Sequence, residues 1–466
     1  MDQQHAPSPL AVQPVGKLIL KFAIPAIISN LISAMYNIVD QIFIGQSVGL
    51  LGNAATNVAF PLVTLCLSIS LLLGVGGASN YSLSMGRGDE EAAARYYGAA
   101  ITFLAIFGIA VGVLVLVFLE PLMLAFGATE LSLPYAMTYT GITAIGMPFQ
   151  IFGTAGSHLI RADGSPRYAM VSITTGAVLN IILDPIFIFP LDMGIAGAAI
   201  ATVIGQISTV VLQAVYFWKL KNHPIRLSHL IPRPKLLTAI GGLGSAAFFN
   251  QVAMMAVQIT MNNVLRRYGE LSPYGSDIPL ACVGVITKVN VVMMAFLIGI
   301  AQGCQPIVGF NYGAGQYSRV RRTYLRAITA ASAIAFLFFL CFQFFPQPIL
   351  AIFDPEGSNM FFRFGTRYFR IYMLAAFLNA IHPLTSNFFT SIGKAKMGML
   401  ISMTRQILFL LPLILLFPMF WGVDGVMYAG PIADFVAAVV ALVLVARELR
   451  RIRSLQDLPL SPEAAG

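Results

Sequence analysis

Four polar side chains interrupt long apolar stretches in the first half of the chain, and their types suit the binding of a small cation. They are Asp40, Asn180, Asp184 and Thr202. Asn180 and Asp184 are four residues apart, so on a helix they share one face. Two carboxylates, an amide oxygen and a hydroxyl at one level form a set of hard oxygen ligands for H⁺ or a small cation. The alternative is that each acid is a structural partner of an Asn, a Thr or a backbone group.

A proline directly after Asp184 favours the site over the structural alternative. Pro185 has no N–H and cannot bond the carbonyl of Ile181, which is left free as a further oxygen. Charged side chains inside a membrane span are costly and mark functional sites by default. All four side chains fall in the outer half of the membrane spans predicted for the first half of the chain. No basic residue of that half lies at the same depth to neutralise them.

The second half of the chain carries a different set of polar residues. Arg405 and Asp434 lie on neighbouring predicted spans, at depths that an extended arginine can bridge, so we expect a structural ion pair rather than a second cation site. Lys288 has three open interpretations: it repels a cationic substrate, pairs with an acid, or extends towards the membrane surface. His382 precedes Pro383 and is either a packed residue at a helix kink or part of a site, whereas His158 is expected to be structural.

A third set of residues is a candidate lining for a substrate cavity. A stripe at helical spacing comprises Gln251, Met254, Met255, Gln258, Met261 and Asn262. Methionine adapts its shape and suits surfaces that accept varied apolar molecules. Ordinary helix packing with polar hydrogen bonds explains the stripe equally well. Weaker candidates for the same wall are Tyr36, Asn37, Met293 and Met294.

The composition assigns these residues to a polytopic membrane protein. Of the 466 residues, 58% are hydrophobic and only 10% are charged, whereas a soluble chain carries about 25% charged residues. The net charge of +9 does not indicate nucleic-acid binding, because the basic residues lie in short loops between apolar runs. The four cysteines also lie in apolar runs and form no C-x-x-C pair, so we expect small apolar core residues.

The pattern predicts an all-α fold with twelve transmembrane helices. In the first half, apolar runs cover approximately 18–45, 54–83, 94–118, 134–160, 167–189 and 195–218. In the second half they cover approximately 236–266, 280–311, 321–345, 363–391, 398–418 and 425–446. Several runs exceed the roughly 20 residues that a span needs, so those helices are expected to tilt, kink or project beyond the bilayer.

The loops and an internal repeat predict the topology. Alternate loops and the tail carry most of the Lys and Arg residues, so we expect these loops and both termini in the cytoplasm. The basic stretch 219–235 lies at the midpoint and is interpreted as a linker. Glycines, a tyrosine and Pro185 recur in the second half at an offset of 227 to 229 residues. We therefore expect two six-helix lobes, residues 1–230 and 231–466, related by a pseudo-two-fold axis along the membrane normal.

Four segments resemble the multidrug and toxic compound extrusion (MATE) family, particularly its bacterial MepA-like branch. They are PAIISNLISAMYNIVDQIFIGQ (25–46), AVLNIILDPIFIF (177–189), QPIVGFNYGAGQ (305–316) and WGVDGVMYAGPIAD (421–434). The resemblance implies two lobes in a V around a central cavity and export of cationic or amphipathic drugs in exchange for H⁺ or Na⁺. The family's first-lobe cation cluster corresponds here to Asp40, Asn180, Asp184 and Thr202. Some members use acids on helices 7 and 10, and this chain has none there.

These observations favour a multidrug efflux antiporter in a bacterial inner membrane, with a role in antibiotic resistance. The expected partners are small organic substrates and the lipid bilayer, not nucleic acid, and we expect a monomer. We expect no cofactor and no metal beyond Na⁺ as a candidate coupling ion. The alternative is a lipid-linked glycan flippase, which needs a strongly cationic cavity, whereas only Lys288 and Arg405 are clearly buried bases here. No H-E-x-x-H, G-x-S-x-G or Walker motif indicates an enzyme or an ATP-driven pump.

Overall fold

The computed structural model describes residues 8–219, 226–275, 277–353 and 358–459, and the regular structure in these ranges is helical. The first half contains α1 (Pro9–Val12), α2 (Val15–Val48), α3 (Leu50–Gly86), α4 (Glu90–Val117), α5 (Leu119–Ala125), α6 (Leu133–Ala162), α7 (Pro166–Ile188) and α8 (Gly194–Trp218). The second half contains η1 (Leu227–Leu230), α9 (Pro234–Glu270), α10 (Asp277–Gly313), α11 (Tyr317–Phe344), α12 (Pro346–Phe353), α13 (Asn359–Tyr372), η2 (Ala376–Leu378), α14 (Ile381–Ser391), α15 (Ala395–Met403), η3 (Thr404–Leu410), α16 (Leu411–Trp421) and α17 (Val423–Arg453).

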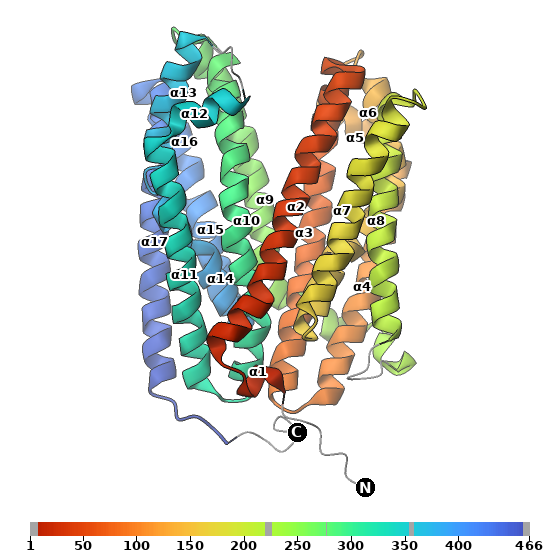
Figure 1. Ribbon diagram of the computed structural model, residues 1–466, viewed down its shortest axis with the longest axis vertical. Helices are drawn as coiled ribbons and strands as arrows, with labels where there is room; N and C mark the ends of the chain where they lie inside the picture. Colours follow the sequence, from red (N-terminus) through yellow and green to blue (C-terminus); the bar gives the residue numbers. More distant parts are fainter. Residues whose placement is uncertain (1–7, 220–225, 276, 354–357, 460–466) are drawn as a thin grey trace.

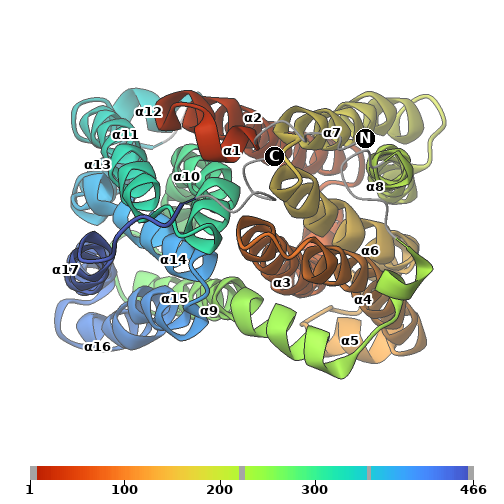
Figure 2. The same ribbon diagram turned by 90° about the horizontal axis from the view of Figure 1, so that it is seen from below.

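The long helices form two lobes side by side, which confirms the predicted fold class (Figures 1 and 2). One lobe comprises α2, α3, α4, α6, α7 and α8, and the other comprises α9, α10, α11, α13 with α14, α15 with α16, and α17. Within the described ranges, ten helical segments are long and apolar enough to cross a membrane. With α6 and the interrupted pair α13–α14 they make the twelve expected spans. Both termini lie at the same end, and the lobes diverge towards the opposite end (Figure 1).

Two of the predicted spans in the second lobe are irregular. The run predicted at 363–391 is divided by η2 between α13 and α14. Pro383 is the third residue of α14, and its ring would clash with the carbonyl of Asn379 in a continuous helix. The break therefore falls one turn before the proline. The run predicted at 398–418 contains the π-helical segment η3 just before Pro412, where the wider turn accommodates the missing N–H.

The repeated glycines have the same backbone role in both halves. Gly164 and Gly393 have φ angles of 86° and 82°, in the turns that follow α6 and α14. Gly88 and Gly315 have φ angles of 79° and 70°, in the turns after α3 and α10. A side chain is disfavoured at such angles, whereas glycine adopts them freely. The internal repeat of the sequence therefore marks equivalent turns of two similar lobes.

The lobes touch in the half of the molecule near the termini, where glycines allow backbones to meet. A Cβ added to Gly76 would lie 1.9 Å from the carbonyl oxygen of Ile240, and one added to Gly244 would lie 1.8 Å from that of Leu72. A Cβ on Gly86 would likewise lie 2.0 Å from the carbonyl oxygen of Phe310. Such contacts let α3 pack directly on α9 and α10 of the other lobe.

The first helix of each half crosses between the lobes. Near the termini, α2 packs on α10, where Ile27 lies against Gly299 and Ala23 against Gly303. Further up, α2 packs on α7 and α8 of its own lobe, and the Phe43 and Phe189 rings meet edge to face at 6.2 Å. Helix α9 is the equivalent helix of the second half, and its first half packs against α3 of the first lobe. Each lobe therefore holds one helix that reaches the other.

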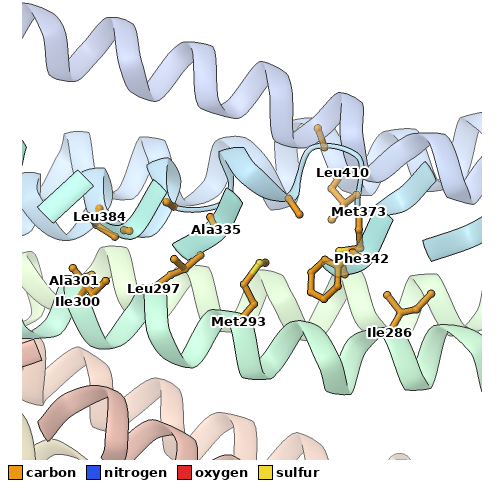
Figure 3. Close-up of a cluster of buried hydrophobic side chains, with 14 of the residues drawn as sticks. Ile286, Met293, Leu297, Ile300, Ala301, Ala335, Phe342, Met373, Leu384 and Leu410 are labelled. Atoms are coloured by element: carbon orange, nitrogen blue, oxygen red, sulfur yellow. The ribbon is translucent and has the colours of Figure 1, made fainter. Parts of the chain in front are cut away.

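The second-lobe core contains a residue that the sequence assigned to the cavity wall. Met293 is completely buried among Leu297, Phe342, Met373 and other apolar side chains between α10 and its neighbours (Figure 3). It does not face the other lobe in this conformation, so its expected place in the wall is wrong here. The expected core position of the cysteines holds for Cys66, Cys282 and Cys304, which are buried, and Cys341 is half-buried.

Candidate functional site

The structure brings together polar side chains from three helices of the first lobe. Asn180 and Asp184 lie on α7, Thr202 on α8 and Asp40 on α2. The Asn180 Nδ2 atom donates hydrogen bonds to Asp184 Oδ1 at 3.2 Å and to Thr202 Oγ1 at 3.3 Å. The carboxyl group of Asp40 lies close enough to that of Asp184 to interact with it. We call these four residues the N-lobe cluster.

The N-lobe cluster is buried, and several of its oxygen atoms have no partner. The exposed fractions of Asp40, Asn180 and Asp184 are 6%, 2% and 0%. Among the described residues, no group bonds Asp40 Oδ1, Asn180 Oδ1 or Asp184 Oδ2. An unsatisfied buried polar atom costs about 1–3 kcal/mol. Three such oxygens in one cluster therefore form an acceptor site that can hold a small cation or bind a proton at one of the carboxyl groups.

Two tyrosines flank the N-lobe cluster, and the sequence identified only one of them. Tyr36 precedes Asp40 by one helical turn on α2 and interacts with Asp40 and Asp184. Tyr139 on α6 is buried and interacts with the same two carboxyl groups. Tyr139 is one of 16 tyrosines, and nothing in its spacing distinguishes it from the others. Only the packing of α6 against α7 and α8 places it beside the acids.

In the second lobe, Arg405 and Asp434 are in contact as expected. Arg405 Nε lies 2.5 Å from Asp434 Oδ1, and both side chains are mostly buried. Arg405 belongs to the π-helical segment η3, and Asp434 lies on α17. Tyr372 and His382 lie beside Arg405. His382 Nε2 is 3.0 Å from the carbonyl oxygen of Ile401, a contact that holds this ring against α15.

The stripe on α9 divides between exposed and buried positions. Met254 and Asn262 are exposed, and Gln251, Met255 and Gln258 are half-buried. Met261 is instead buried against Tyr368, whose hydroxyl lies 4.0 Å from the Met261 sulfur. Gln258 Nε2 donates to Asn262 Oδ1 at 3.0 Å. The structure therefore leaves five of the six side chains accessible on a helix that borders the other lobe.

The remaining candidates lie at scattered positions. Asn37 is exposed on α2, and its Nδ2 donates to the carbonyl of Ser33 at 2.7 Å. Met294 is half-buried against the second-lobe core. Lys288 is exposed on α10, with its ammonium 5.9 Å from the centre of the Phe353 ring. His158 is buried near the end of α6, and its Nδ1 has no partner among the described residues.

A family profile matches this chain in both lobes. The MatE profile covers residues 25–186 and 246–416. These two stretches contain Asp40, Asn180 and Asp184 in the first lobe and Arg405 in the second. The match spans well over half of the chain, and its two parts correspond to the two repeats.

Individual proteins of known function or structure are similar over nearly the whole chain. The multidrug export protein MepA of Staphylococcus aureus is 23% identical over 433 residues, which cover 93% of this chain and 94% of that protein. The MATE multidrug transporter DinF-BH, solved as a complex with a ligand, is 33% identical over 98% of this chain and all of that one, with a TM-score of 0.88. A MATE family transporter of the MOP superfamily in an outward-facing conformation is 22% identical, covers 97% of this chain and all of its own, and has a TM-score of 0.89.

Proposed function

This chain belongs to the MatE family, and we propose that it is a secondary active antiporter that exports cationic or amphipathic organic compounds in exchange for H⁺ or Na⁺. The family and its relatives are transporters, which supports transport rather than catalysis as the activity. The similarity to a multidrug export protein and to a multidrug transporter solved with a ligand supports organic compounds as the substrates.

The observation that carries the proposal is the set of three unpartnered oxygens in the N-lobe cluster. An antiporter needs a group that binds the ion in one state and releases it in the other. Asp40 Oδ1, Asn180 Oδ1 and Asp184 Oδ2 are buried acceptors with nothing bound among the described residues. A bound Na⁺ can be held by all three oxygens together, whereas a proton on one carboxyl group can donate to one other oxygen. Either ion therefore changes the free energy of this arrangement more than that of an already satisfied network.

Helix α2 is a direct route from the ion to the contact between the lobes. Its upper half carries Asp40 into the N-lobe cluster, and its lower half packs Ile27 against Gly299 of the other lobe. Neutralising the cluster removes the repulsion between Asp40 and Asp184 and lets α2 repack. A repacked α2 alters its contact with α10, and the lobes rock. The ion and the substrate must bind the two states with different affinities for this coupling to exist.

The topology follows from the charge distribution. The basic loops and the tail, with Arg450, Arg451 and Arg453 in the last turn of α17, lie at the end that carries both termini. We therefore propose a multi-pass protein of the bacterial inner membrane with both termini in the cytoplasm. The lobes then diverge towards the outside. We assign residues 1–230 and 231–466 to the two lobes and propose that one chain suffices for transport.

The flippase alternative is not favoured, because the expected bases do not form a cationic cavity. Arg405 is paired with Asp434, so it contributes no net charge. Lys288 is exposed and lies over an aromatic ring.

Efflux of ethidium from proteoliposomes tests the proposal. We expect the wild type to export ethidium under an imposed pH gradient or an imposed Na⁺ gradient, and the active gradient identifies the ion. Asp184→Asn is expected to abolish gradient-driven efflux. Asp192→Asn is the matched control, because it makes the same change at an exposed residue eight positions away. Full efflux by Asp184→Asn would refute the role of the N-lobe cluster.

A further inference from the structure

A pocket lined by α12 and α13 lies outside the lobe interface, and these two helices lie at the end of the molecule opposite the termini (Figure 1). It encloses about 540 Å³. Its lining contains three arginines on one face of α13, Arg363, Arg367 and Arg370, and none of its lining residues is acidic. The other lining residues are polar or apolar: Gln347, Asn359, Phe362, Thr366 and Ile371. We call this the α13 pocket.

The α13 pocket has an excess of positive charge and an unsatisfied hydroxyl. Arg367 is paired with Asp424 on α17 at 2.9 Å. Arg363 and Arg370 have no acidic partner among the described residues, and both are exposed. The buried Thr366 Oγ1 lies between them in sequence and has no hydrogen-bond partner in the described part of the chain. Counted over the described residues, the pocket therefore presents two guanidinium groups without an acidic partner, and one hydroxyl without a partner is buried behind them.

This concentration of arginine is unusual for its position. The helices are long: the 34 residues of α2 span about 51 Å, whereas the hydrocarbon core is about 30 Å thick. Each end of the molecule therefore projects about 10 Å into the interfacial region. Arg363 and Arg367 lie four and eight residues after the start of α13 at Asn359, which is about 6 Å and 12 Å along the helix. By these lengths, Arg363 and Arg367 would lie near the level of the lipid phosphates, and the Arg370 side chain can extend towards that level.

The surface beside the pocket is apolar and exposed. Phe344 and Phe345 precede Gln347 between α11 and α12, and Leu374 follows Arg370 by four residues. All three are more than half exposed. An exposed apolar surface next to an arginine pocket suits a ligand with a charged head and an apolar chain.

We propose that the α13 pocket binds a phosphate group at the membrane interface opposite the termini. Arginine holds phosphate oxygens through two parallel N–H bonds, with a geometry that lysine lacks. Arg363 and Arg370 supply the charge, and Arg367 is fixed by Asp424. The headgroup of an anionic lipid and free inorganic phosphate share this chemistry. The site lies outside the N-lobe cluster and does not depend on the proposed antiport.

Lipid binding by purified full-length protein tests the site. Native mass spectrometry measures the dissociation constant for phosphatidylglycerol, with phosphatidylcholine as the zwitterionic comparison. In parallel, the midpoint of thermal unfolding is measured in inorganic phosphate and in chloride at equal ionic strength. The variant is Arg363→Gln/Arg370→Gln. The matched control is Arg266→Gln/Arg267→Gln, which removes two exposed arginines from the end of α9, outside the pocket.

We expect the pocket variant to weaken phosphatidylglycerol binding at least tenfold and the control variant to leave it unchanged. Binding of phosphatidylglycerol without stabilisation by inorganic phosphate identifies a lipid headgroup, and stabilisation by inorganic phosphate identifies the free ion, provided that the pocket variant loses the effect. Equal binding by both variants, or no binding by the wild type in either arm, would overturn the proposal. Arg363→Lys/Arg370→Lys keeps the charge, so intermediate binding by this variant supports the requirement for guanidinium geometry if the Gln variant misfolds.

Discussion

At the scale of single residues, the two lobes differ in whether a buried acid has a basic partner. In the second lobe, Asp434 has an arginine partner at 2.5 Å. In the first lobe, Asp184 has no basic partner among the described residues, and its neighbours are an amide, another acid and two tyrosines. At the repeat offset of 227 residues, Ile407 and Leu411 stand where the first lobe has Asn180 and Asp184. The repeat therefore preserves the backbone while one lobe alone carries the unpaired acids.

Tyr139→Phe tests whether the tyrosine beside the N-lobe cluster takes part in ion binding. The change removes one hydroxyl that interacts electrostatically with Asp40 and Asp184, and a hydrogen bond formed by this hydroxyl when the ion binds would be worth about 1 kcal/mol. We expect the ion concentration for half-maximal efflux to rise about fivefold. Tyr97→Phe is the control, because Tyr97 is equally buried and its hydroxyl has no partner among the described residues. An identical ion dependence of both variants would exclude Tyr139 from the site.

The acids of the site were predictable from the sequence because charged residues inside apolar runs are rare. Asp40 and Asp184 stand out for that reason, and the spacing of Asn180 places it on the same face. Tyr139 carries no such signal, because an aromatic residue in an apolar run is ordinary. Met293 was assigned to the wrong face, since α10 is apolar on most sides and only its packing decides which side meets the second-lobe core.

At the scale of secondary structure, prolines decide where the second-lobe helices are irregular. Pro383 and Pro412 are visible in the sequence, but a proline alone does not distinguish a kink from a break. The structure has a break before Pro383 and a π-helical segment before Pro412. The outcome depends on whether neighbouring side chains satisfy the freed carbonyls, which are contacts between helices distant in sequence. The helix ends were more predictable, because repeated glycines with positive φ mark them.

The ion pair between η3 and α17 is expected to be structural. Breaking a buried pair by removing one partner costs about 3–5 kcal/mol, whereas replacing both partners with apolar residues is close to neutral. Asp434→Leu should therefore lower the free energy of unfolding in detergent, and Arg405→Met/Asp434→Leu should recover it. The double variant should also retain ethidium efflux. Recovered stability without recovered efflux would assign the pair a role in transport.

At the scale of the whole molecule, the contact between the lobes near the termini holds the observed conformation. The closest approaches are backbone to backbone, through Gly76 with Ile240 and Gly244 with Leu72. Gln305 adds side-chain hydrogen bonds across the same contact, to the Val75 carbonyl at 3.2 Å and to the Ser79 hydroxyl at 2.9 Å. Because these contacts require a residue without a Cβ atom, any side chain at Gly244 must push the lobes apart at this end.

Gly244→Leu should shift the molecule towards a conformation closed at the opposite end. A Cβ at this position would lie 1.8 Å from the Leu72 carbonyl oxygen, whereas one at Gly241 on the same helix meets nothing within 4 Å. We expect a shorter distance between spin labels at Leu131 and Leu271, which are exposed at the diverging ends of the two lobes, after the native cysteines are replaced. Gly241→Leu is the control. A distance distribution unchanged from wild type in Gly244→Leu would contradict this account of the contact.

The central claim is that ion and substrate movements are coupled through the N-lobe cluster. The most direct measurement uses the substrate gradient to drive the ion. An ethidium gradient is imposed across proteoliposomes without any ion gradient, and the flux of H⁺ or Na⁺ is measured. We predict an ion flux opposite to the ethidium flux in wild type and in Asp192→Asn, and none in Asp184→Asn. An ion flux of wild-type size in Asp184→Asn would contradict the account.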